Sequence, residues 1–121
     1  MKQTVLVVGA SPKPDRYSHR AVVMLAEYGH TVIPVHPLAE TIAGIPAVSA
    51  LAAVTERPDT VSIYVRPERL RPMLPDLIAL KPGRVIFSPG TEDAEIAAEL
   101  ERVGISVLDA CTLVMLRTGQ F

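Results

Sequence analysis

The N-terminal third of the chain restricts the fold more than any other stretch, because it holds two apolar runs separated by a helical pattern. The first run, at residues 4–8, enters a loop that extends to Ser18. An amphipathic segment follows, and the second apolar run is at residues 31–35. A strand, a helix and a second strand in this order predict a βαβ unit, and the loop after its first strand commonly binds nucleotides.

The loop at residues 9–18 departs from the glycine-rich pattern of a dinucleotide-binding loop. Gly9 permits a sharp turn close to a phosphate, but arginine, lysine and hydroxyl side chains stand where further glycines are expected. The guanidinium of Arg16 suits a phosphate. At the end of the second strand, His36 replaces the acid that binds a ribose hydroxyl. We therefore expect a ligand rich in phosphate rather than ordinary NAD.

Three of these positions also have a purely structural interpretation, and both interpretations remain open. Gly9 also fits a tight exit from a strand. Ser18 is also a suitable N-cap for the following helix. His36 lies between two prolines and is also consistent with a surface histidine.

Length and patterning predict one α/β domain that spans residues 1–121. Its core must be aliphatic, because 49% of the residues are hydrophobic and only 4% are aromatic. Strands alternating with helices predict a single Rossmann-like, doubly wound parallel sheet of five strands in the order 3-2-1-4-5, with helices on both faces. The strands are expected at residues 4–8, 31–35, 60–65, 84–87 and 105–108.

Periodicity and capping signals predict the helices. The first helix is expected to start near Ser18 and to end at Gly29, and a helix over residues 92–103 is expected to start after Thr91 and to end at Gly104. Two prolines interrupt the pattern after residue 67, so we expect a turn at 67–71 and a helix that begins at 72–75. A short helix is expected at 49–54.

In a doubly wound sheet, ligands bind beyond the carboxyl ends of the strands, here at the switch point expected between strands 1 and 4. Arg69 and Arg71 continue the positive charge after the third strand, but we expect them to be solvated. The candidate binding residues are Gly9, Ala10, Ser11, Lys13, Arg16, Ser18, Val35, His36, Pro37, Tyr64, Val65, Arg66, Ser88 and Gly90.

Charge and cysteine content argue against several classes of function. The net charge of -1 gives no general case for binding nucleic acid or an anionic membrane. The N-terminal apolar run is too short for a signal peptide or a membrane span. A single cysteine, Cys111, offers no internal disulfide and no metal framework. We expect a cytoplasmic protein without a metal site.

The sequence contains no convergent set of acid, base and nucleophile, so we expect no catalytic residues. Cys111 has no histidine near it in the sequence, and a lone cysteine is more often a small buried hydrophobe than a nucleophile. The first strand does not end in a pair of acids, as a phosphoacceptor domain requires. No tyrosine and lysine stand four residues apart, as in short-chain dehydrogenases.

Over essentially its whole length, the chain resembles the small bacterial CoA-binding proteins related to the N-terminal CoA-binding domain of the succinyl-CoA synthetase alpha subunit. The segments that carry the resemblance are residues 8–11, 14–18, 28–37, 66–68 with the strand before them, and 109–111.

The resemblance implies a Rossmann-like fold that holds coenzyme A, with its 3′-phosphate and diphosphate near the first loop and the end of the second strand. Gly9, Ser11, Arg16 and Ser18 correspond to the phosphate loop. His36 and Pro37 stand where the family commonly has asparagine and proline. The chain departs from the family at residues 88–91, and at Ala110, where arginine is common.

Three hypotheses of function follow. The first is a stand-alone protein that binds coenzyme A or acyl-CoA without catalytic machinery; the second domain that completes the synthetase is not expected here. The second is a redox or transferase enzyme that uses NADP or CoA together with Cys111. The third is a CoA-sensing regulatory or interaction module, in which residues 113–116 form either a homodimer contact or a last helix packed on the sheet.

Overall fold

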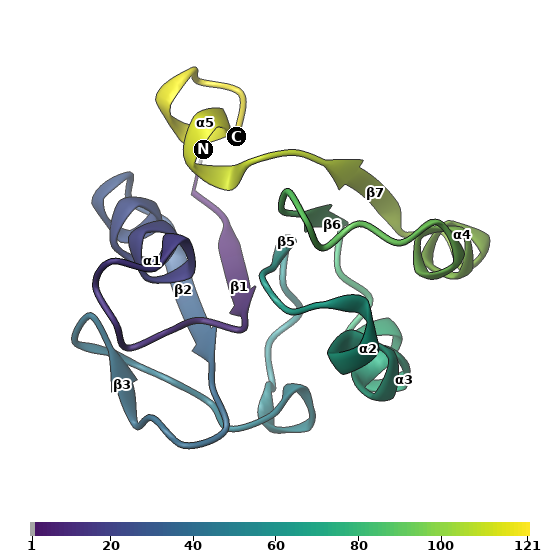
Figure 1. Cartoon of the computed structure of the whole chain (residues 1–121), viewed down its shortest axis with the longest axis horizontal. Helices are drawn as coiled ribbons and strands as arrows, with labels where there is room; N and C mark the ends of the chain where they lie inside the picture. The colour runs from purple at the N-terminus through teal and green to yellow at the C-terminus, as the bar shows by residue number, and fades with distance from the viewer. Residues whose placement is uncertain (1) are drawn as a thin grey trace.

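The computed structural model describes residues 2–121 and contains a five-stranded parallel sheet with helices on both faces (Figure 1). This confirms the predicted fold class. The sheet strands are β1 (Thr4–Val8), β2 (Thr31–Val35), β5 (Thr60–Ile63), β6 (Arg84–Phe87) and β7 (Ser106–Asp109). They lie in the order β2-β1-β5-β6-β7. A separate hairpin is formed by β3 (Thr41–Ile42) and β4 (Ile45–Pro46).

Two hydrophobic clusters cover the two faces of the sheet. On one face, Val5 and Val7 of β1 pack with residues of α1 (Tyr17–Glu27) and α5 (Thr112–Arg117). On the other, Leu6 and Val8 join the second cluster. Its helical elements are the short turn η1 (Leu51–Ala53), α2 (Pro67–Leu70), the turn η2 (Arg71–Met73), α3 (Leu74–Ala79) and α4 (Ala94–Arg102). The alternation of β1 between the two clusters is that of a strand buried on both faces.

The strand order corrects the expected 3-2-1-4-5 in one respect. The third strand of the sheet, β5, pairs directly with β1 instead of lying outside β2, so the five strands lie in chain order 2-1-3-4-5. The switch point is therefore between β1 and β5, because the chain proceeds to opposite sides from this pair.

Proline and burial explain this order. Pro34 of β2 has no N–H group, and proline is confined to the edge strands of a sheet. The carbonyl of Pro34 accepts a hydrogen bond from the Val48 N–H on the side away from β1, so its missing donor also faces the edge. All four residues of β5 are buried, as an inner strand requires.

The two long helices end as predicted but begin differently. Helix α1 starts one residue before Ser18, so Ser18 is a buried residue of the first turn and not the N-cap. For α4, Asp93 is the cap, and its carboxylate accepts a hydrogen bond from the Ile96 N–H (3.0 Å). The hydroxyl of Thr91, the expected cap, instead donates to the Ser88 carbonyl (2.7 Å).

The middle of the chain follows the sequence pattern apart from the hairpin, which was not predicted. Helix α2 begins at a proline, and η2 and α3 each carry a proline in the first turn, where its missing N–H is tolerated. The hairpin turns at Ala43 and Gly44, which both have positive φ, as a two-residue hairpin loop requires.

The C-terminal stretch is a last helix, one of the two expected alternatives. Leu113, Met115 and Leu116 are buried, whereas Val114 remains 51% exposed.

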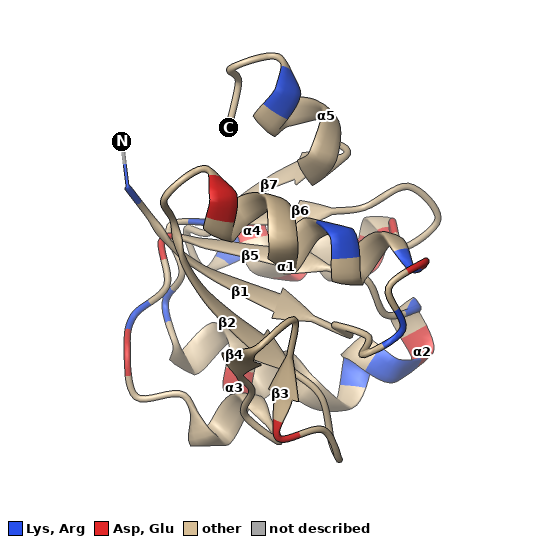
Figure 2. Ribbon diagram, turned by 90° about the vertical axis from the view of Figure 1, so that its left-hand side faces the viewer, with Lys and Arg blue, Asp and Glu red and all other residues tan. Residues whose placement is uncertain are grey.

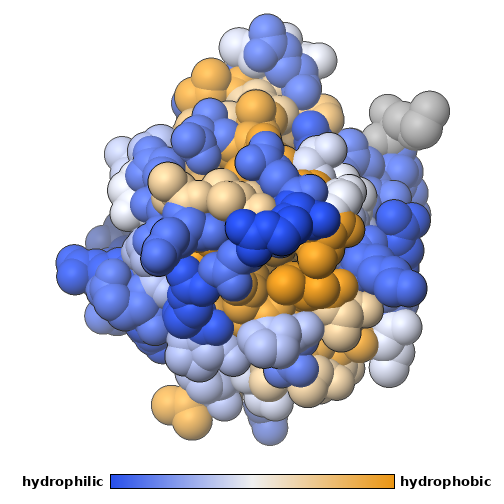
Figure 3. Space-filling view, turned by 90° about the vertical axis from the view of Figure 1, so that its right-hand side faces the viewer, coloured by the Kyte–Doolittle hydropathy of each residue, from blue (hydrophilic) through white to orange (hydrophobic). Residues whose placement is uncertain are grey.

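On the side of the molecule where α4 and β7 lie, Figure 3 shows hydrophobic surface between strongly hydrophilic side chains. Homodimer formation stays a prediction. No helix within residues 2–121 is both long and apolar enough to cross a bilayer.

Gly9 allows the ends of β1 and β5 to approach each other closely. Its φ is +86°, and a Cβ at this position would lie 2.7 Å from Val65 Cγ1 and 3.1 Å from the Tyr64 carbonyl carbon. The Tyr64 N–H donates to the Val8 carbonyl at 2.9 Å. The structural interpretation of Gly9, a tight strand exit, is therefore sufficient to explain why glycine stands here.

We predict that Gly9→Ala lowers the free energy of unfolding by about 2–4 kcal/mol, because left-handed strain adds to a collision with β5. Gly104→Ala is the matched control, since Gly104 has the same φ of +86° and no atom within 4 Å of the added Cβ. In this control only the left-handed strain is added, so the free energy of unfolding should fall by about 1–2 kcal/mol. Urea unfolding measures both losses, and equal losses would show that contact with Val65 does not restrict position 9.

Candidate functional site

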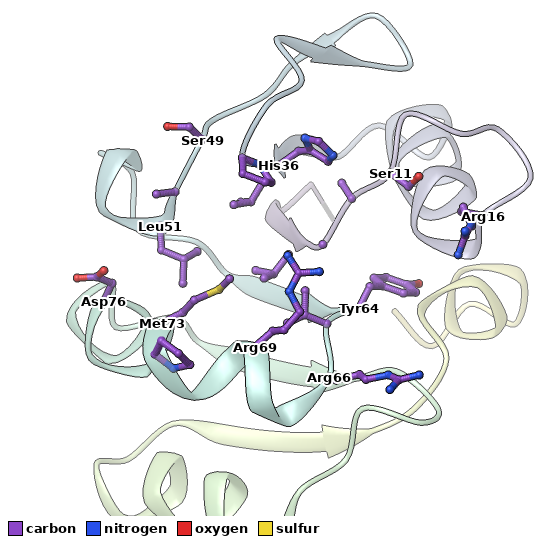
Figure 4. A pocket seen from close by; sticks show the side chains of 18 residues that line it. Ser11, Arg16, His36, Ser49, Leu51, Tyr64, Arg66, Arg69, Met73 and Asp76 are labelled. Carbon is purple, nitrogen blue, oxygen red and sulfur yellow. The ribbon is translucent and has the colours of Figure 1, made fainter.

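The carboxyl ends of β1, β2 and β5 open into a cleft of about 660 Å³, here called the first cleft (Figure 4). Residues 49–51, α2 and η2 complete its walls. The cleft is lined by Val8, Gly9, Ala10, Ser11, Arg16, Val35, His36, Pro37, Ser49, Ala50, Leu51, Tyr64, Val65, Arg66, Arg69, Pro72, Met73 and Asp76.

The loop after β1 is held by its own hydrogen bonds. The Ser11 hydroxyl accepts from the Lys13 N–H (3.1 Å), so the hydroxyl hydrogen remains available to a ligand. The Ser11 carbonyl is 2.9 Å from Nδ1 of His19, which donates to it. Arg16 is exposed at the N-cap of α1. The loop therefore presents one hydroxyl and one guanidinium to the first cleft.

At the end of β2, His36 uses one ring nitrogen to organise its own turn. Its Nδ1 accepts hydrogen bonds from the N–H groups of Leu38 (3.0 Å) and Ala39 (2.8 Å). Nδ1 thus carries no hydrogen, and the neutral ring has its hydrogen on Nε2. His36 lines the cleft with one N–H donor and no carboxylate.

After β5, the chain forms the floor and part of the rim of the cleft. Val65 is buried and packs against the β1 exit, and Arg66 is exposed. The Tyr64 ring lies between this cleft and a second one. Burial raises the pKa of the Tyr64 phenol, an effect that nearby serine hydroxyls partly offset. Tyr64 therefore remains a neutral phenol at neutral pH.

Arg69 is exposed, as expected for a solvated side chain, and it also lines the first cleft, which was not expected. Figure 4 shows its guanidinium extending from α2 into the space between His36 and Tyr64. Helix α2 begins at Pro67, directly after the strand exit, so a side chain of its first turn stays at the carboxyl edge of the sheet. The cleft is also lined by residues that carry no binding signal in the sequence: Ser49, Ala50, Leu51, Pro72, Met73 and Asp76.

The first cleft is positively charged. It contains the arginines at positions 16, 66 and 69 and only one acid, Asp76. Within residues 2–121, both ion pairs use Arg71, which contacts Glu95 and Glu99. The three cleft arginines therefore have no carboxylate partner in the described chain. Figure 2 shows that basic positions of α2 and of the loop before α1 lie on the same side of the molecule.

Four predicted residues do not line the first cleft. Lys13 is exposed elsewhere on the loop, and Ser18 is buried within α1. Gly90 is exposed and its N–H donates to the Glu92 carboxylate (2.8 Å). Ser88 lines a different cleft. The remaining ten predicted residues come together in the first cleft.

The second cleft, of about 610 Å³, lies on the side of Tyr64 covered by α1 and α5. Both clefts include Tyr64 in their lining. The second cleft is lined by Tyr17, Arg20, Tyr64, Ser88, Pro89, Thr91, Cys111, Leu113, Val114 and Arg117. In the part of the chain that the structure describes, no group of three His, Cys, Asp or Glu residues is placed to hold a metal ion.

A family model described as "CoA binding domain" matches residues 3–117. The chain belongs to this family. YneT of Bacillus subtilis (strain 168), itself described as uncharacterized, is 36% identical over 66 residues, which are 54% of this chain and 49% of YneT. The match therefore spans about half the length of that curated relative.

Solved structures share the fold of this chain. The crystal structure of an uncharacterized protein has a TM-score of 0.94 and 36% identity, with 100% of this chain and 99% of that chain covered. The dinucleotide forming acetyl-coenzyme A synthetase 1 of Ca. Korarchaeum cryptofilum has a TM-score of 0.74 and 20% identity, with 88% of this chain and 25% of that chain covered. At this identity, the likeness shows the fold alone. The family resemblance inferred from the sequence is confirmed.

We predict that His36→Asn keeps the stability of the protein, because the asparagine carbonyl can accept the same two amide hydrogen bonds. His36→Ala leaves both amides without this acceptor and should lower the free energy of unfolding by about 1 kcal/mol. Urea unfolding of the two variants tests this. An alanine variant as stable as the asparagine variant would contradict the structural role of Nδ1.

Proposed function

We propose that this chain binds coenzyme A or an acyl-CoA in the first cleft. The observation that carries the proposal is the set of three arginines without carboxylate partners around one cleft at the switch point of the sheet. Coenzyme A bears a diphosphate and a 3′-phosphate, and guanidinium groups bind phosphates through paired, charge-assisted hydrogen bonds. Family membership supports the same ligand.

The arginines divide between the centre and the rim of the cleft, which suits a ligand with separate phosphate groups. Arg69 extends into the middle of the cleft, whereas Arg16 lies at the end formed by the β1 loop (Figure 4). In the proposed complex, Arg69 binds one phosphate group, and Arg16 with the Ser11 hydroxyl binds another. Arg66 adds positive charge at the rim.

Apolar side chains provide a surface for the adenine ring. Val35, Leu51 and Val65 are buried at the cleft, and Met73 is half-buried beside them. Ligand sites commonly combine such apolar walls with a few polar groups that fix orientation. His36 offers an N–H donor near the end of β2, so the site does not repel a phosphorylated ribose as an acid would.

We propose binding without catalysis as the role of the first cleft. Nδ1 of His36 is engaged with two amides, and Nε2 carries the hydrogen of the neutral ring, so neither nitrogen is a free base. A cytoplasmic location remains part of this proposal.

We predict that coenzyme A binds at least about tenfold more tightly than dephospho-CoA, since a charge-assisted phosphate contact is worth about 1.5–3 kcal/mol. Arg69→Ala should weaken coenzyme A binding by about tenfold or more on the same grounds. Isothermal titration calorimetry measures these affinities. Arg102→Ala, at the exposed end of α4, is the matched control and should bind like the wild type.

Two outcomes would contradict the proposal. No heat of binding with coenzyme A would exclude the ligand class. Equal affinities for coenzyme A and dephospho-CoA, unchanged in Arg69→Ala, would remove the assignment of the phosphates to the first cleft. NADP carries a ribose phosphate but no pantetheine. Its affinity, measured in the same way, tests the alternative that the first cleft binds NADP.

A further inference from the structure

The two clefts meet at Tyr64, and the second contains chemistry that binding in the first does not use. The Tyr64 ring borders both, so a ligand longer than the first cleft passes this ring to reach the second. Coenzyme A is such a ligand, because a pantetheine arm with a terminal thiol extends from its diphosphate.

Ser88 is the first indication of a ligand in the second cleft. Ser88 lines the cleft and is only 3% exposed. Within residues 2–121 its Oγ makes no hydrogen bond of good geometry, although it is close enough to the Tyr64 phenol to lower the pKa of that group. A neighbouring hydroxyl pair, Ser62 and Thr112, satisfies itself at 2.8 Å. An unsatisfied buried hydroxyl is costly, and such groups are commonly completed by another molecule.

Cys111 is the second indication of a ligand in the second cleft. It is a free, half-buried thiol that lines the same cleft as Ser88. Arg20 and Arg117 also line this cleft, and neither forms an ion pair within the described residues. The thiol therefore lies in the cleft on the far side of Tyr64, together with two cations and outside both hydrophobic clusters.

We propose that the second cleft receives the thiol end of coenzyme A and that Cys111 forms a mixed disulfide with it by exchange with CoA disulfide. This inference rests on the proposed function, because the nucleotide in the first cleft is what brings the reacting sulfur to Cys111. Ser88 supplies its unused hydroxyl to an amide of the pantetheine arm.

The exchange balances without any further reagent. The Cys111 thiol first gives its proton to solvent. Its sulfur then attacks one sulfur of CoA disulfide, forms the new S–S bond and displaces the other half as coenzyme A thiolate, which takes up a proton. Cys111 is thereby oxidised, and one half of the CoA disulfide is reduced to the free thiol. The reverse reaction with free coenzyme A or another thiol releases the cysteine.

Nucleotide binding makes the exchange selective. Binding in the first cleft raises the effective concentration of the disulfide at Cys111, whereas a disulfide without a nucleotide reacts only by collision. Selectivity for CoA disulfide distinguishes the proposal from an ordinary exposed thiol, which reacts with any disulfide according to its access and ionisation.

The test is the rate of mixed-disulfide formation, followed by intact-protein mass spectrometry. We expect CoA disulfide to react at least about tenfold faster than glutathione disulfide at equal concentration. Arg69→Ala should remove most of this advantage but leave the rate with glutathione disulfide unchanged. Arg102→Ala should keep the advantage, and Cys111→Ser should take up neither group.

Equal rates with the two disulfides would overturn the inference. If coenzyme A still bound in calorimetry, that result would leave the proposed function intact. An absence of coenzyme A binding would instead remove the proposed function itself, so the two failures are distinguishable.

Ser88→Ala tests the path of the arm independently of the cysteine. It should weaken coenzyme A binding by about tenfold, the value of one good hydrogen bond, and leave the affinity for adenosine 3′,5′-bisphosphate unchanged because that ligand has no pantetheine. The bisphosphate also serves as the control for folding. Unchanged affinity for coenzyme A would contradict the placement of the arm beside Ser88.

Discussion

Close contact between the ends of β1 and β5 positions the groups of both clefts. Gly9 brings the β1 exit against Tyr64 and Val65, and the Tyr64 N–H to Val8 carbonyl bond extends the pairing of these strands beyond the sheet. Beyond this point the chain leaves the two strands toward opposite sides, which opens the first cleft. Because Tyr64 stands at the junction, the same contact also sets the wall that separates the first cleft from the second.

The inner strands were predictable because a strand buried on both faces needs an apolar run, as β1 and β6 show. The edge strand β7 is more exposed and has only two apolar residues, Val107 and Leu108. The order of the strands was not predicted correctly, although Pro34 contained the signal. An inner β2 would need hydrogen bonds on both sides, and Pro34 cannot donate one. The order 2-1-3-4-5 satisfies this constraint, whereas the expected order placed β2 between two neighbours.

The candidate site was predictable to the level of strand ends, but not the direction of each side chain. Ser62 and Tyr64 alternate with Val61 and Ile63, so they face α1 and α5 while the apolar pair faces the other cluster. Ser88 follows Phe87 by the same alternation and therefore falls in the second cleft. Strand ends that meet at one edge of a sheet still direct their side chains to two opposite faces. The alternation of side chains along the strand could therefore have separated Ser88 from the phosphate-binding candidates.

Arg69 and Arg71 show why the charge of the first cleft does not follow from the composition. Residues two apart on a helical turn point in nearly opposite directions. Arg71 accordingly faces α4 and is paired with Glu95 and Glu99, whereas Arg69 faces the cleft. The acids of α4 thus neutralise an arginine that has no role in the cleft, and the positive potential at the switch point persists in a chain whose net charge is -1.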